Sequence, residues 1–322
     1  MPQEQPISNS STGSLLRPDE QVFAAMLDGW RSQQLARNLA FGTVEGREKV
    51  VRAFGSHADA FPWEWSARSV DEWLGDLRAV RNLKRSTLRN YQEAVRSFCH
   101  YVTDPAYGWA AEREQRFGTH PVQVVHEWNT AVHIQEAEAD PGKRGFTLEE
   151  IQAFIDYADE QVLAVRGRGR KGWLSAFRDA TMFKAAYGYG LRRRENKMLD
   201  TCDFGRNPSG PEFGEYGVCY VRFGKAMTGS PPKRRSVLTV WDWVCEALEQ
   251  WEAEIRPRFP TAEGNTAMWP SERGPRVGYS QMNSRFAAYR DALGLDPGLD
   301  YHSFRRSYVT HLISSIRRAE GL

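Results

Sequence analysis

The sequence has no long apolar run and few cysteines. No stretch approaches the roughly twenty uninterrupted apolar residues of a transmembrane helix, so no membrane span is expected. Residues 1–18 lack a basic start and an apolar core, so they predict a polar disordered tail rather than a secretory signal. The four cysteines form no CxxC pair or zinc-type Cys/His cluster. We therefore expect four reduced, buried thiols in a cytoplasmic protein, with no metal and no disulfide.

The chain also lacks a strong excess of one charge. Its 43 Lys and Arg residues face 41 Asp and Glu residues, which leaves a net charge of +2. A nucleic-acid partner would therefore have to be recognised by local basic patches rather than by the total charge. No P-loop and no cluster of metal-binding carboxylates is visible, and we expect no cofactor.

What the sequence does contain is typical of a globular protein with two domains. It has 322 residues, of which 41% are apolar and 26% charged, and its eleven Trp, twelve Tyr and sixteen Phe residues provide bulk for packed cores. The length exceeds what a single core usually serves, so two domains are predicted.

The first domain is predicted to be a helical bundle over residues 19–105. Ser69 and Glu72 have the spacing of a capping box at the start of a helix. The next helix should begin near Ser86, because apolar residues then recur every three or four positions, at Leu88, Tyr91, Val95, Phe98 and Val102. Residues 106–145 are punctuated by proline and glycine and are predicted to be a linker, with either a short helix or a strand in its middle.

The second domain is predicted to span residues 146–322 and to be mostly helical with one β-hairpin. A capping box at Thr147 and Glu150 opens its first helix, and a helix over about 174–188 should stop at Gly190. Two Val-, Tyr- and Phe-rich stretches, 216–223 and 234–240, predict an antiparallel hairpin with a long loop. Helices should resume at 241–255, near 280–293, and from residue 303 onward. The fold class is therefore mainly α with a small antiparallel sheet.

Three short stretches of the second domain carry candidate chemistry. The stretch 190–195, Gly-Leu-Arg-Arg-Arg-Glu, places arginines directly after a helix end, where a guanidinium can present two donors to a phosphate. Lys225 follows a glycine in the hairpin loop, and His302 stands three residues before Arg305. Taken singly, each is more often a solvated basic turn, a loop lysine or a capping histidine.

Together, and in this order, the three stretches resemble the tyrosine recombinase (phage integrase) family. The stretch 190–195 is similar to the family's G-L-R-x-x-E box, Lys225 to its hairpin lysine, and His302 with Arg305 to its H-x-x-R box. Residues 84–91 resemble part of the family's SAM-like, core-binding domain, and the likeness covers roughly residues 20–322. It implies site-specific DNA recombination, in which a strand is broken and rejoined through a 3′-phosphotyrosyl intermediate.

The resemblance also implies roles for the matching residues. Arg192 and Arg305 would hold the phosphate, whose developing charge needs fixed cations when no metal is used. Lys225 would protonate the leaving 5′ oxygen, and His302 would assist proton transfer. Lys233 is a weaker candidate for the lysine role, and Arg306 for that of Arg305. Glu195 is expected to orient Arg192 or to cap the next turn.

The resemblance departs from the family at the end of the chain. Family members place their nucleophilic tyrosine on helices that follow the H-x-x-R box, whereas only Tyr308 follows Arg305 here. We expect Tyr308 to be structural and the nucleophile to be missing from this chain, as in a truncated protein. Three hypotheses follow: a recombinase whose nucleophile comes from elsewhere, an inactive DNA-binding remnant, and a helical interaction protein without DNA activity.

Double-stranded DNA is the partner that the resemblance implies. Candidate backbone contacts are basic residues at a helix start in the first domain and in the hairpin loop of the second, namely Lys84, Arg85, Arg89, Lys233 and Arg235. The basic loop 166–171 is a similar candidate. A homo-tetramer on DNA is expected for a full-length form.

Overall fold

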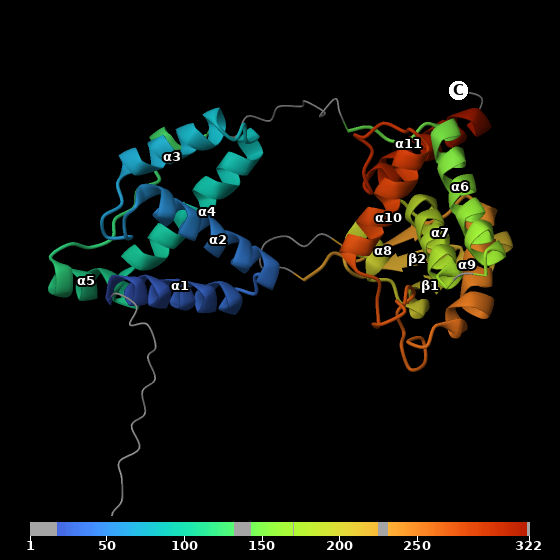
Figure 1. Cartoon of the computed structure of the whole chain (residues 1–322), viewed down its shortest axis with the longest axis horizontal. Coiled ribbons are helices and arrows are strands. Elements are labelled where there is room, and N and C mark those ends of the chain that lie inside the picture. Colours follow the sequence, from blue (N-terminus) through green and yellow to red (C-terminus); the bar gives the residue numbers. More distant parts are fainter. Residues whose placement is uncertain (1–17, 132–142, 170, 225–230, 321–322) are drawn as a thin grey trace, which may run out of the picture. The chain divides into compact units, whose positions relative to one another are not determined.

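The computed structural model describes residues 18–131, 143–169, 171–224 and 231–320, which form two compact units on either side of residue 135. Figure 1 shows both units as mainly helical, and a three-stranded antiparallel sheet lies in the second. The predicted fold class is confirmed. The predicted disordered tail lies outside the described residues, except for Pro18. No helix among the described residues is long and apolar enough to cross a membrane.

The first unit is a bundle of five α-helices built around aromatic residues. Trp30, Phe54 and Phe98 are fully buried and come from three different helices. The helices are α1 (Pro18–Ala36), α2 (Phe41–Ala58), α3 (Ala67–Ala79), α4 (Arg85–Thr103) and α5 (Trp109–Phe117), with 3-10 turns η1 (Pro105–Tyr107) and η2 (Glu127–Asn129). Helix α4 begins within a residue of its predicted start.

The predicted capping box at Ser69 and Glu72 is wrong. Helix α3 begins three residues earlier, because the Ser66 side chain accepts the backbone N–H of Ser69 and is the real cap. Ser66 and Ser69 both fit the sequence pattern of a helix cap. Packing decides which of the two serines starts the helix.

The predicted linker, 106–145, is too long. Val124 and Val125 are buried in the core of the first unit, and Trp109 packs against it. The segment is fastened to α4 by Gln92, whose amide donates to the carbonyl of Asn129 at 3.1 Å and accepts the N–H of Ala131 at 3.1 Å. The first domain therefore extends to at least residue 131, and η2 is the short helix in the segment's middle.

The second unit is organised around helix α7 (Trp173–Gly188), which is buried on nearly all sides. Helices α6 (Leu148–Gly167), α9 (Asp242–Gln250) and α11 (Ser303–Glu320) pack against it (Figure 1). The capping box at Thr147 and Glu150 is confirmed at the start of α6, with both reciprocal hydrogen bonds present. The remaining α-helices are α8 (Arg193–Lys197) and α10 (Tyr279–Ala292). The shorter elements are the 3-10 segments η3 (Thr201–Asp203), η4 (Pro211–Tyr216) and η6 (Arg256–Arg258) and the π-helical segment η5 (Trp251–Ile255).

The predicted hairpin is present and shorter than its two apolar stretches. Strands β2 (Val218–Val221) and β3 (Arg235–Leu238) pair antiparallel with Val221 opposite Arg235, and β1 (Phe204–Gly205) adds an edge beside β2. The loop between β2 and β3 is closed where the N–H of Gly224 donates to the carbonyl of Lys233 at 3.0 Å. A Cβ on Gly224 would lie 2.4 Å from that carbonyl oxygen, so this close approach requires glycine.

The cysteines remain free thiols, as predicted for all four, but they are not all buried. Cys99, Cys219 and Cys245 are buried, whereas Cys202 is exposed. Burial raises the pKa of Cys245 to about 11, so this thiol stays protonated near neutral pH.

Candidate phosphate-binding site

The turn between α7 and α8 fixes the first candidate residue. Helix α7 ends as predicted, with Gly190 in the left-handed region at φ +55° and the N–H of Leu191 donating to the carbonyl of Ala186 at 2.9 Å. Arg192 is then the N-cap residue of α8. Its side chain is about one-third exposed, at 38%, so the guanidinium remains accessible to a ligand.

Glu195 holds two arginines that come from different elements. Its carboxylate accepts the backbone N–H and the Nη1 of Arg192, each at 2.8 Å. It also accepts both terminal nitrogens of Arg235 from β3, each at 2.7 Å. The Glu195 side chain is only 1% exposed, so this pairing takes place inside the protein.

The pKa of Glu195 reflects that environment. Burial alone would raise it, but the hydrogen bonds from Arg235 and Arg192 outweigh burial and lower it to about 2. The carboxylate is therefore charged throughout the physiological range and orients two guanidinium groups. Glu195 has both of the roles expected for it. It orients the Arg192 side chain, and it caps the turn by accepting the backbone N–H of Arg192.

Arg305 from α11 completes what we call the arginine cluster: Arg192, Arg235, Arg305 and Glu195. Its Nη1 donates to the carbonyl of Gly190 at 2.6 Å, which ties α11 to the turn that carries Arg192. The pKa of Arg305 is lowered by burial and by the nearby charges of Arg235 and Arg192. Three guanidinium groups against one carboxylate give the cluster an excess of positive charge, as an anion site requires.

His302 lies beside the cluster in a form suited to accept a proton. Its pKa is lowered by burial and by the positive charge of Arg306, with smaller contributions from Arg192 and Arg305. The imidazole is therefore neutral at neutral pH. Its backbone N–H donates to Asp300 at 2.9 Å, which fixes the turn before α11.

Lys225, the predicted general acid, lies outside the described residues. The rival Lys233 is exposed, and the structure places its carbonyl at the base of the loop. Arg306, the rival of Arg305, forms a 3.7 Å ion pair with Asp300 instead of joining the cluster. His311 is buried, and its Nδ1 lies 2.9 Å from the hydroxyl of Tyr187, so it belongs to the packing of the domain.

Tyr308 is engaged in packing, in keeping with the structural role expected for it. Its hydroxyl donates to the carbonyl of Leu238 at 2.9 Å, and its ring makes an edge contact with Trp241. A Cβ on Gly190 would lie 2.5 Å from this ring, so the tyrosine and the glycine fit closely together.

An ion network at the base of the hairpin was not foreseen. Arg222, one residue past β2, donates to both Asp200 and Asp203, and Arg276 donates to Asp200. The network fastens the end of β2 to the η3 turn. Arg222 stands three positions before Lys225 in the sequence.

The predicted backbone contacts of the first unit cluster at one helix start. Lys84 is the N-cap residue of α4, Arg85 its first residue, and Arg89 follows one turn later. Of the two predicted contacts in the other unit, Lys233 is exposed, whereas Arg235 is committed to Glu195.

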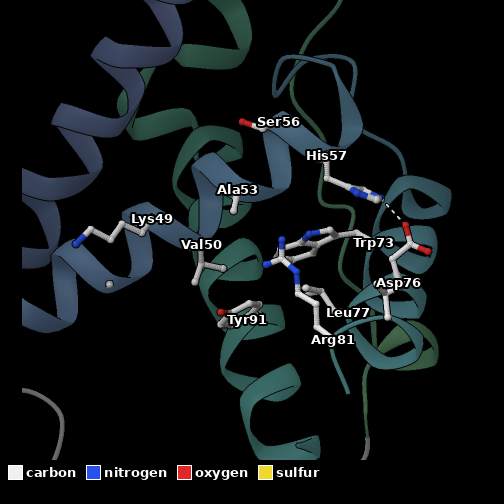
Figure 2. Close-up of a pocket in the computed structure, with 12 residues that line it drawn as sticks. Lys49, Val50, Ala53, Ser56, His57, Trp73, Asp76, Leu77, Arg81 and Tyr91 are labelled. Atoms are coloured by element: carbon white, nitrogen blue, oxygen red, sulfur yellow. Dashed lines mark ion pairs between the residues drawn. The ribbon is translucent and has the colours of Figure 1, made fainter. Parts of the chain in front are cut away.

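The first unit also contains a cavity of about 760 Å³ between α2, α3 and α4 (Figure 2). Trp73 and Tyr91 stack in it with their ring centres 5.7 Å apart. Lys49, Arg81 and the His57–Asp76 pair contribute to its polar lining.

Comparison with known proteins supports one family. No family model matches the chain. The tyrosine recombinase XerC of Escherichia coli O1:K1 is 22% identical over 285 residues, which cover 79% of this chain and 85% of the relative. XerC of Shewanella amazonensis is 28% identical over 140 residues, 44% of this chain and 41% of the relative.

Solved structures show the same fold. The XerH site-specific recombinase bound to a palindromic difH substrate aligns with a TM-score of 0.62 at 15% identity, over 94% of this chain and 88% of its own. Lambda integrase (residues 75–356) bound to DNA aligns with a TM-score of 0.57 at 14% identity, over 91% and 87%. The chain is therefore similar to tyrosine recombinases over most of its length, and it shares their fold.

The stretches that resemble the G-L-R-x-x-E and H-x-x-R boxes both contribute to the arginine cluster. Arg192, Arg305 and His302 lie near one another, although 113 positions separate the two arginines in the sequence, and the catalytic roles that the resemblance implied for them stay predictions. Arg235 was predicted to be a phosphate contact of the loop, and its tie to Glu195 makes it a member of the cluster. No pattern within either stretch predicts that pairing.

Proposed function

We propose that this protein is a tyrosine recombinase, which binds double-stranded DNA and takes part in site-specific recombination by phosphoryl transfer. The observation that carries the proposal is the arginine cluster with a neutral histidine beside it. Arg192 and Arg305 would hold the non-bridging oxygens of one DNA phosphate, and Glu195 and the Gly190 carbonyl would fix their directions. The DNA-bound forms of XerH and lambda integrase, which share the fold, support this choice of substrate.

In this proposal the remaining groups handle protons. Neutral His302 would accept a proton or a hydrogen bond near the phosphate, and Lys225 would deliver one to the departing 5′ oxygen. Because the tyrosyl–phosphate bond conserves the energy of the broken strand, no nucleotide cofactor is required. Tyr308 is not assigned as the nucleophile, since its hydroxyl is held by Leu238. The source of the nucleophile stays a prediction, as does the truncation.

We place the activity in the cytoplasm, with assembly of several copies on DNA. A lambda integrase tetramer bound to a Holliday junction aligns with a TM-score of 0.54 at 13% identity, over 92% of this chain and 76% of its own. The predicted homo-tetramer follows that precedent. Lys84, Arg85, Arg89 and Lys233 remain proposed backbone contacts.

Salt-dependent DNA binding tests the proposal. Arg192→Ala and Arg305→Ala should each weaken binding to a short duplex and lower the slope of log K against log salt. The double variant should lower that slope by about 0.9 in total, because both arginines serve one phosphate. Arg258→Ala is the control, because this exposed arginine lies over the ring of Trp173 and has no place in the cluster. Wild-type affinity that does not change with salt would overturn the proposal and favour a helical interaction protein.

Strand cleavage is tested separately with nicked duplexes drawn from a randomised library. A covalent protein–DNA adduct formed by this chain alone would exclude an inactive DNA-binding remnant. If an adduct forms, it should persist in Tyr308→Phe, and its loss in that variant would show that Tyr308 is the nucleophile after all.

A further inference from the structure

A second group of cations lies on α8 beside the arginine cluster and is held by α10. The guanidinium of Arg193 lies 5.1 Å from the ring centre of Tyr279, and the ammonium of Lys197 lies 4.1 Å from it. Arg193 also donates to the side-chain oxygen of Asn283 at 2.7 Å. Two cations are thus gathered over one aromatic ring.

These two cations have no charge partner in the described part of the chain. No carboxylate there pairs with Arg193 or Lys197, whereas Arg192 and Arg276 each pair with one and Arg222 pairs with two. Arg193 and the ring of Tyr279 are exposed, so the positive charge faces solvent. Two uncompensated cations held against one ring repel each other, and an anion bound by both would relieve that repulsion.

The position of the group connects it to the proposed phosphate site. Arg193 directly follows Arg192, and it lines a cavity of about 460 Å³ together with His302 and Asn283. Consecutive residues at a helix start direct their side chains to different sides, so the two arginines are suited to different anions. Phosphates recur along a DNA strand at about 3.4 Å of helix axis, so a strand held at Arg192 brings others close by.

The one carboxylate of this cavity does not cancel its positive charge. Asp300 already pairs with Lys143 at 3.4 Å and with Arg306 at 3.7 Å. The third cation near the cavity, Arg290, is bound to Asp291 and to backbone carbonyls. Arg193 and Lys197 are therefore the groups left to meet a ligand.

We propose that Arg193, Lys197, Tyr279 and Asn283 form a second phosphate subsite, which holds a backbone phosphate flanking the one in the arginine cluster. The subsite rests on the proposed DNA function and adds to it a grip on the strand beside the reacting phosphate. Tyr279 keeps the two cations close together, and Asn283 fixes the guanidinium of Arg193. Because both cations are already ordered, little side-chain entropy is lost when the phosphate binds.

The test compares salt slopes for one short duplex of arbitrary sequence. Arg193→Ala and Lys197→Ala should each lower the slope of log K against log salt, and the double variant should lower it by about 0.9 in total, because both cations serve one phosphate. The matched control is Arg258→Ala, which also removes an exposed cation from an aromatic ring. Its slope should equal that of the wild type.

The outcomes separate the subsite from the function on which it rests. If the wild type binds with a steep slope and both variants match Arg258→Ala, the subsite is wrong while the DNA function stands. If the wild type shows no salt-dependent binding, both are wrong. Thermal unfolding of each variant shows whether the fold is intact, and weaker binding without a change in slope would also reject the subsite.

Discussion

Glu195 is the residue on which the geometry of the arginine cluster depends. It is buried, it is charged, and it accepts hydrogen bonds from a helix cap and from a strand. A buried ionised carboxylate is tolerated only where such partners offset its loss of water. The function of Arg192 and the stability of the domain are therefore linked through a single side chain.

We predict that Glu195→Gln destabilises the protein at neutral pH by on the order of 3 kcal/mol, because the carboxyl pKa falls from 4.5 to about 2 on folding. The folded-state pKa is depressed, so this contribution is complete above about pH 4.5 and is lost as the pH falls toward 2. Urea midpoints measured across that window should show wild type and variant converging in acid.

The control for this prediction is Glu215→Gln. Glu215 also pairs with an arginine, Arg206, but both side chains are largely exposed. Its removal should leave the urea midpoint close to that of the wild type, because exposed ion pairs are screened by water and salt. A Glu195→Gln variant that is no less stable than this control would show that the buried pairing contributes nothing.

At the scale of single elements, α4 acts as the support for the end of the first unit. Its buried Gln92 binds the backbone on both sides of residue 130, and Arg96 donates to the side chain of Thr130 at 2.5 Å. Residues 130 and 131, which directly follow η2, belong to no strand or helix, so these side chains replace the usual backbone pairing.

Gln92→Ala should release that segment. Two backbone groups would be left without partners, at a cost of about 1–3 kcal/mol, and limited proteolysis between residues 119 and 131 should become faster. Gln152→Ala is the matched control, because Gln152 is exposed on α6 and bonds only to Asp156. Equal cleavage rates for the two variants would contradict the supporting role of Gln92.

The boundaries of the elements could be predicted from the sequence where local side-chain and backbone preferences set them. They could not be predicted where long-range packing sets them. The cap at Thr147 and the stop at Gly190 follow from side-chain and backbone preferences within a few residues. The burial of Val124 and Val125 does not, because proline and glycine on either side give the same pattern as an exposed linker. For the site, the two motif arginines were predictable, whereas the Arg235–Glu195 pair spans forty residues and only the fold creates it.

On the scale of the whole molecule, the two units have separate cores. One hydrophobic cluster is confined to residues 22–125 and the other to residues 146–304. Each holds enough buried aromatic surface to support a domain of its size.

Fragments 18–131 and 143–322 should therefore fold independently. Each is expected to be helical by circular dichroism and to unfold in its own cooperative transition, and the two spectra should add up to that of the full chain. A fragment without a cooperative transition would mean that its core needs the other unit. The boundary at 131 tests the revised domain limit, since a fragment cut at residue 105 lacks Val124 and Val125 and should be much less stable.

The bond from Arg305 to Gly190 has a consequence for how this protein tolerates mutation. The acceptor is a main-chain carbonyl, so no exchange of a neighbouring side chain in the turn can delete it. The bond is sensitive at its two ends instead: Arg305 supplies the donor, and at Gly190 any larger residue meets the Tyr308 ring and an unfavourable φ. The other side chains of the turn can therefore vary without loss of this bond, and the constraint falls on these two positions.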